Sequence, residues 1–165
     1  MAPESIVVRE ANPKDYDSVW EIFENVIKTG DTYVFDPNTK KEDLSKHWFA
    51  PYMKTYVAED QNEILGTYII KPNQIGLGSH IANCSYMVNL NAQGKGIGKL
   101  MCEHSIENAR QSGYKAIQFN IVVSTNAIAV KLWEKFGFKI IGNIPNGFRH
   151  IELGFVDAYI MHKKL

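Results

Sequence analysis

Several features that would assign the chain to other protein classes are scarce or missing. It has two cysteines, Cys84 and Cys102, whose spacing matches neither a disulfide framework nor a metal site, so we expect reduced thiols and no metal. No apolar run approaches the roughly 20 residues that a membrane span needs. The first residues lack the basic and apolar segments of a signal peptide. These absences predict a cytoplasmic protein without a membrane partner.

The formal net charge of the chain is zero. The 18 basic and 18 acidic side chains cancel, and no run of Lys or Arg stands out, so we expect no nucleic-acid partner. The 165 residues, 45% of them hydrophobic, suffice for one sizeable core, and no linker or internal repeat divides them. We therefore expect a single domain over residues 1–165.

Three glycines at alternate positions form the most informative stretch. Gly94, Gly96 and Gly98 follow a strand expected at 81–88 and precede a helix expected at 97–109. A glycine turn that enters a helix exposes unpaired N–H groups and favours anions, often phosphate. The spacing is one residue short of a dinucleotide fingerprint, and Lys99 is followed by Leu100 rather than the hydroxyl residue of a Walker loop.

Hydrophobic periodicity and turn residues predict alternating strands and helices. We expect helices near 13–29, 41–49, 97–109 and 125–136, the last with Ser124 or Thr125 as its cap. Strands are expected at 6–10, 55–58, 64–70, 81–88, 116–123, 138–141 and 156–161, with a loop over 142–154. This order defines an α/β single domain.

Two motifs on this element order resemble one family. Gln93-x-x-Gly96-x-Gly98 resembles the Q/R-x-x-G-x-G/A signature of the GCN5-related N-acetyltransferases (GNAT). Residues 126–138, NAIAVKLWEKFGF, look like the N-x-x-A-x-x-L-[YH]-E-K-x-G-F segment of the same family. The resemblance implies the α/β (α+β) GNAT fold: a mixed seven-stranded sheet flanked by four helices and splayed between its fourth and fifth strands.

The resemblance also implies acetyl-coenzyme A (acetyl-CoA) as co-substrate. The backbone N–H of Val88 would be catalytic, because it would point at the thioester oxygen, where amine attack develops negative charge. The implied cofactor-binding residues are Met87, Val88, Gln93, Gly94, Lys95, Gly96, Ile97, Gly98, Lys99, Asn126 and Trp133.

The chain departs from the family at two positions. Trp133 stands where many members have a tyrosine acid, and an indole N–H is no proton-transfer acid near neutral pH. The strand at 81–88 lacks the usual glutamate base. Deprotonation could pass through ordered water, involve a neutral amine, or use His80 or His150, although loop histidines usually have no catalytic part. Cys84 lacks an activating partner nearby in sequence, so we interpret it as packing.

Asn83 and Asn120 are polar residues within otherwise apolar strands. They resemble a pair in the fungal acetyltransferases that act on proline analogues such as azetidine-2-carboxylate, so they are catalytic and substrate-binding candidates. The alternative is that each amide bonds neighbouring backbone. Tyr33, Phe35 and Arg149 fall where family members build the acceptor pocket, although an exposed arginine is usually only solvated.

The sequence predicts an N-acetyltransferase that moves an acetyl group from acetyl-CoA to a small-molecule amine, such as an amino acid or its analogue, by direct attack. One alternative is acetylation of a protein or peptide amine, which would favour an acidic acceptor groove. Another is a non-catalytic acyl-CoA-binding module, consistent with the missing Tyr and Glu. A homodimer is expected only by analogy with the fold.

Overall fold

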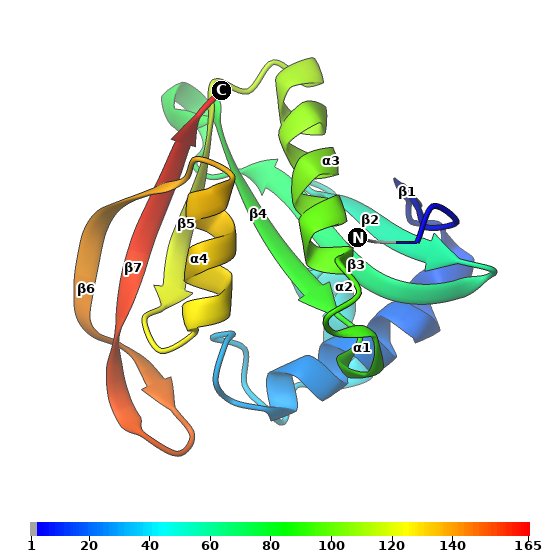
Figure 1. Cartoon of the computed structure of the whole chain (residues 1–165), viewed down its shortest axis with the longest axis horizontal. Helices are drawn as coiled ribbons and strands as arrows, with labels where there is room; N and C mark the ends of the chain where they lie inside the picture. Colours follow the sequence, from blue (N-terminus) through cyan, green and yellow to red (C-terminus); the bar gives the residue numbers. More distant parts are fainter. Residues whose placement is uncertain (1–2) are drawn as a thin grey trace.

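The computed structural model describes residues 3–165 and places one seven-stranded sheet between two layers of helices (Figure 1). The strands are β1 (Val7–Glu10), β2 (Lys54–Asp60), β3 (Glu63–Pro72), β4 (Ile81–Val88), β5 (Ala116–Val123), β6 (Lys139–His150) and β7 (Gly154–Lys164). The helices are α1 (Tyr16–Lys28), α2 (Leu44–His47), α3 (Ile97–Gln111) and α4 (Ala127–Lys135). The sheet order is β1-β2-β3-β4-β5-β7-β6, and β4 and β5 form its parallel pair.

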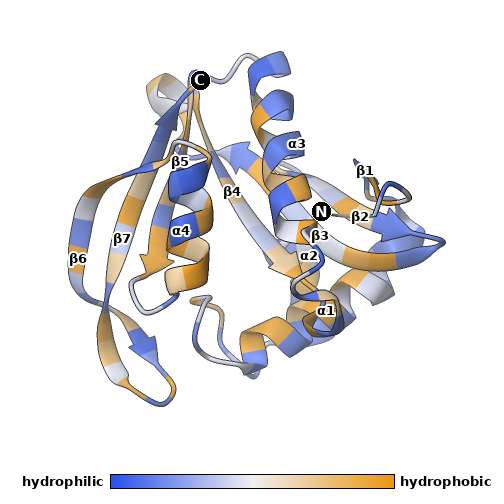
Figure 2. Ribbon diagram, viewed as in Figure 1, coloured by the Kyte–Doolittle hydropathy of each residue, from blue (hydrophilic) through white to orange (hydrophobic). Residues whose placement is uncertain are grey.

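A separate core covers each face of the sheet. On one face, α3 and α4 pack over the sheet around residues such as Met101, Tyr86 and Phe119. On the other face, α1 and α2 enclose Phe23, Trp48 and their neighbours. Figure 2 shows hydrophilic residues on the outer turns of α3 and hydrophobic residues along the central strands. The mixed sheet with four flanking helices confirms the predicted fold class.

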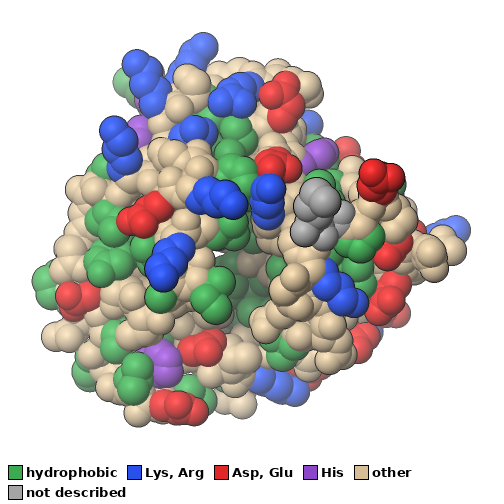
Figure 3. Space-filling view, in the orientation of Figure 1, with side chains coloured by type: hydrophobic (Ala, Val, Ile, Leu, Met, Phe, Trp, Pro, Cys, Tyr) green, Lys and Arg blue, Asp and Glu red, His purple; other side chains and the backbone are tan. Residues whose placement is uncertain are grey.

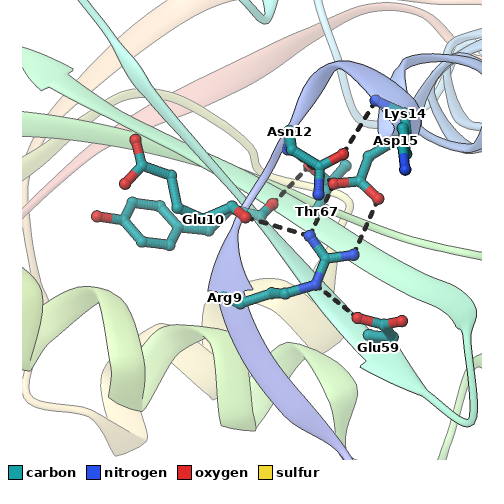
Figure 4. A network of polar contacts seen from close by, with 8 residues as sticks. Arg9, Glu10, Asn12, Lys14, Asp15, Glu59 and Thr67 are labelled. Carbon is teal, nitrogen blue, oxygen red and sulfur yellow. Dashed lines mark hydrogen bonds and ion pairs between the residues drawn. The ribbon is translucent and has the colours of Figure 1, made fainter.

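A polar cluster fixes the N-terminal segment to the sheet (Figure 4). Asn12 caps the 3₁₀ turn Pro13–Asp15, and the Asp15 carboxylate accepts the Asn12 N–H at 2.8 Å. The Arg9 guanidinium donates to both Asp15 oxygens, at 2.7 and 2.9 Å, and to Glu59 on β2 at 2.5 Å. These bonds lower the pKa of Asp15 and join β1, β2 and the start of α1.

Two predicted boundaries were wrong. The loop expected over 142–154 is mostly strand, because β6 continues to His150. Gly142 and the Pro145–Gly147 stretch coincide with register shifts against β7, so the turn residues mark bulges and do not end the strand. Helix α4 begins at Ala127, and Asn126, not Ser124 or Thr125, is its cap, with Oδ1 accepting the Ala129 N–H at 3.3 Å.

Candidate active site

The centre of the sheet is open between β4 and β5. Backbone pairing joins them only at Ile81 with Ala116 and Ala82 with Ile117, after which the strands diverge (Figure 1). At the point of divergence the Asn83 side chain donates from Nδ2 to the Gln118 carbonyl at 2.9 Å. Beyond it, the facing edges of β4 and β5 are not paired with each other, and a ligand that enters like an added strand could bond them.

The hydrogen bonds of Tyr33 show which backbone groups of β4 face this gap. Its hydroxyl accepts the Tyr86 N–H at 3.0 Å and donates to the Tyr86 carbonyl. Because N–H groups alternate between the two edges of a strand, the N–H of Val88 lies on the same edge as that of Tyr86. The Asn89 N–H bonds Leu65 of β3, on the opposite edge, as this alternation requires.

A cavity of about 300 Å³ occupies the gap and reaches both faces of the sheet. Its lining includes Tyr33 and Phe35 from the α1 side and Trp133 from α4 on the other side. Figure 3 shows a hollow on the face carrying α3 and α4, with Lys and Arg side chains beside it. This volume suits a small ligand.

The structure brings together six of the predicted site residues: Tyr33, Phe35, Asn83, Asn120, Asn126 and Trp133 all line the cavity. Arg149, whose side chain is exposed on β6, does not line it. Nor does Met87, whose side chain is buried in the α1 core and whose backbone N–H lies on the β3 edge of the strand, opposite the gap. The cavity wall on β4 is formed by Asn83–Tyr86 rather than by Val88.

The positions of Asn83 and Asn120 fit substrate binding in part, and their hydrogen bonds fit the alternative, bonding to neighbouring protein groups, in part. Both line the cavity, yet Asn83 bonds backbone through Nδ2, and Asn120 bonds the side chains of Asn73, at 2.7 Å, and Gln118, at 3.1 Å. The Asn83 Oδ1 accepts no hydrogen bond within residues 3–165. Asn83 therefore keeps an acceptor atom for a ligand, while its amide nitrogen closes the narrow end of the gap.

The glycine turn lies at the wide end of the gap. Gly94 and Gly96 have φ of +79° and +78°, which favour glycine, and Gly96 is the N-cap of α3. A Cβ on Gly98 would lie 3.7 Å from Leu132 of α4 and 3.9 Å from Val88, so the turn adjoins both walls. Within residues 3–165, none of the backbone N–H groups from Gln93 to Lys99 donates a hydrogen bond. This geometry can bind a phosphate chain.

Trp133 packs inside the site. Its ring centroid lies 4.9 Å from that of Tyr86 and 4.8 Å from that of Phe119. The packing interpretation therefore accounts for this side chain, which also forms part of the cavity wall.

The described residues that line the cavity include no Asp, Glu or His. His80 is exposed outside it, and the Nδ1 of His150 accepts the N–H groups of Glu152 and Leu153 in the β6–β7 turn. Burial raises the pKa of Cys84 to about 12, so this thiol stays protonated near neutral pH. No group of three or more potential metal-ligating side chains lies within residues 3–165.

Among the polar residues of the wall, sequence reasoning missed Lys71 and Ser85 as site residues, whereas Thr32 belongs to the stretch expected at the acceptor pocket. Lys71 lies near the end of β3, where a lysine looks like an ordinary surface residue. Only the β3–β4 register, which pairs Lys71 with Asn83, would have indicated its place.

The site combines a glycine turn with unpaired N–H groups, an unpaired strand edge and a cavity, which are features that suit an acyl-CoA-dependent acyltransferase. Residues 16–138 match the Acetyltransferase (GNAT) family, and the chain belongs to this family. It is an acetyltransferase of the acyl-CoA N-acyltransferase type.

Known relatives agree with this assignment. The chain is 30% identical over 151 residues to N-acetyltransferase aca1 of Schizosaccharomyces pombe, covering 81% of this chain and 72% of that protein. A GCN5-related N-acetyltransferase from Kribbella flavida superposes with a TM-score of 0.95 at 38% identity, over 99% of this chain and 100% of that one.

A more distant structure shares the fold. YncA from Salmonella typhimurium, solved with acetyl-CoA, has a TM-score of 0.86 at 20% identity, over 98% of this chain and 95% of that one. None of the helices within residues 3–165 combines the length and the apolar character of a membrane span.

Proposed function

We propose that this chain transfers the acetyl group of acetyl-CoA to the amine of a small molecule, an amino acid or its analogue, by direct attack. The observation that carries the proposal is the cavity of about 300 Å³ between β4 and β5, which is lined by residues from both faces of the sheet. A thioester held from the side of α3 and α4 and an amine from the side of Tyr33 would meet between β4 and β5.

Acetyl-CoA is the co-substrate of this reaction. The unpaired N–H groups from Gln93 to Lys99 fit its pyrophosphate, and the open edge of β4 fits its pantetheine amides. The acetyl-CoA in the Salmonella structure of the same fold supports this choice.

Catalysis rests on alignment and on backbone hydrogen bonds. Amine attack places negative charge on the thioester oxygen, and a preorganised N–H donor stabilises that charge. Val88 and Tyr86 offer such donors on one edge, and Tyr86 is the one in the cavity wall. Because Tyr33 bonds the Tyr86 N–H, a thioester using that donor displaces the Tyr33 hydroxyl.

Among the described residues, the cavity wall supplies no Asp, Glu or His as a general base. Without Asp, Glu or His in its wall, the acceptor amine reacts as its neutral form or loses its proton to water. The same absence disfavours a peptide acceptor with a cationic segment, which an acidic groove would recognise.

The first experiment measures thiol release from acetyl-CoA with free amino acids, their analogues and polyamines, alongside calorimetric binding of acetyl-CoA. We expect turnover with amino acids, a loss of turnover in Asn83→Ala or Asn120→Ala, and a loss of cofactor binding in Gly96→Glu. Binding without turnover would instead favour a non-catalytic acyl-CoA-binding module, and turnover with peptides alone would favour protein acetylation. No binding would contradict the proposal altogether.

A further inference from the structure

Lys71 is the only charged side chain among the described residues that line the cavity. It is half-buried, and its Nζ lies 5.8 Å from the ring centroid of Tyr52. Within residues 3–165 no carboxylate lies within 4.0 Å of this ammonium group. Lys71 is therefore a charged residue of the wall that no ion pair within residues 3–165 neutralises, and its flexible side chain extends from the wall toward Tyr52.

The neighbour of Lys71 across the sheet is Asn83, which offers the opposite kind of group. The two residues are directly paired in the β3–β4 register. With its Nδ2 bound to the Gln118 carbonyl, Asn83 presents Oδ1 as a hydrogen-bond acceptor. Directly opposite residues in an antiparallel pair have Cβ atoms about 5 Å apart, so the cation and the acceptor lie on adjacent positions of one face.

A cation and a neutral acceptor on adjacent positions match the two ends of an amino acid. Its carboxylate fits an ammonium group, and its amine N–H fits an amide oxygen. A polyamine would place a positive charge beside Lys71 without a carboxylate to offset it, and like charges at such distances repel.

We propose that Lys71 binds the carboxylate of the acceptor while the Oδ1 of Asn83 accepts a hydrogen bond from its amine. The acceptor is then an amino or imino acid with a free carboxylate. This inference rests on the proposed function and adds to it the residue that selects the substrate class.

The test pairs two variants with two forms of one acceptor. Lys71→Met removes the charge and Lys71→Arg keeps it, and each is assayed with an amino acid and with the corresponding amino-acid amide. Lys54→Met is the matched control, because Lys54 is exposed on the neighbouring strand β2 and does not line the cavity. Thermal melting of every variant checks its folding.

We expect Lys71→Met to raise the KM for the amino acid on the order of 10-fold or more, with kcat and the KM for acetyl-CoA unchanged. The KM for the amide should not change, Lys71→Arg should restore part of the amino-acid affinity, and Lys54→Met should behave as wild type. If the Lys71 charge binds the carboxylate, its loss raises the KM for the amino acid only. If Lys71 has a structural role, its loss affects both acceptors.

Equal losses for acid and amide, or a wild-type preference for amino-acid amides, would overturn the role of Lys71 and leave the acetyltransferase proposal standing. Acetyl-CoA binding without turnover of any amine would overturn both.

Discussion

At the scale of single residues, the cavity wall sets the pH dependence. Within residues 3–165 the wall contains no Asp, Glu or His, so it offers none of the usual general bases. We expect log(kcat/KM) to rise with pH with a slope of about 1 until the acceptor amine itself is deprotonated. For acceptors whose amines differ in pKa, the pH of this break should differ by the same number of pH units as the amine pKa values. A break near pH 6–7 that stays fixed for every acceptor would indicate an enzyme base and contradict the expectation.

Cys84 lines the cavity but should not react. Burial raises the pKa of its thiol to about 12, so almost none is thiolate at pH 7. We expect Cys84→Ser to keep kcat within a few-fold and the native thiol to resist iodoacetamide until the protein is unfolded. Rapid alkylation of the native protein at Cys84, with matching loss of turnover, would instead support a nucleophilic role.

The sequence predicted the residues that carry an unusual local signal, such as Asn83 and Asn120 within apolar strands, and both line the cavity. It did not predict Lys71, because a lysine on a strand has no local signal and its place depends on pairing with β4. Arg149 was proposed for the pocket on resemblance alone, and its exposed position on β6 gives it no support from the cavity.

At the scale of elements, the glycine turn offers a matched pair of substitutions. Gly96 has a φ of +78°, so Gly96→Ala should cost about 1–2 kcal/mol of unfolding free energy. Gly98 has only ordinary contacts around a built Cβ, at 3.7 and 3.9 Å, so Gly98→Ala should leave stability unchanged or slightly raised. Urea unfolding of both variants measures the difference, and equal losses would show that backbone conformation is not the constraint at Gly96.

The Arg9–Asp15 ion pair should make the free energy of unfolding fall at acidic pH. The pKa of Asp15 is lowered in the folded protein, chiefly by hydrogen bonds from Arg9, so its contribution is present above the unfolded pKa of about 3.9 and is lost as pH falls below it. We expect Asp15→Asn to be less stable at pH 7 and to lose less stability between pH 5 and pH 2.5 than the wild type. Asp17→Asn, which alters an exposed carboxylate, is the control. If Asp15→Asn lost as much stability between pH 5 and pH 2.5 as the wild type, the acid dependence would not come from Asp15.

The sequence predicted correctly those strands and helices whose hydrophobic periodicity is not interrupted by turn residues. The strand at 81–88 and the start of α3 at Ile97 were both correct. Strand β6 was missed because Gly142, Pro145 and Gly147 are turn residues, and pairing with β7 overrides them through bulges. That pairing spans the whole of β7, and sequence alone does not reveal it.

At the scale of the whole molecule, acetyl-CoA should stabilise the native fold. The surfaces proposed to bind it exist in the folded state alone, because the glycine turn, β4 and α4 meet only there. Saturation at 100 times Kd should therefore add about 2.7 kcal/mol of stability and raise the melting temperature. Gly96→Glu should melt at the same temperature with and without acetyl-CoA. An equal shift in both proteins would place the binding site elsewhere.

The splayed sheet also has a consequence for inhibition. Exposed strand edges recruit other chains and invite aggregation, but the unpaired lengths of β4 and β5 face each other in the middle of the sheet. A short, extended, strand-mimicking compound could insert there and add backbone hydrogen bonds to β4 and β5 without any phosphate. Such a compound would take its selectivity from the register of the two strands and from the Tyr33 hydroxyl it displaces, rather than from charge.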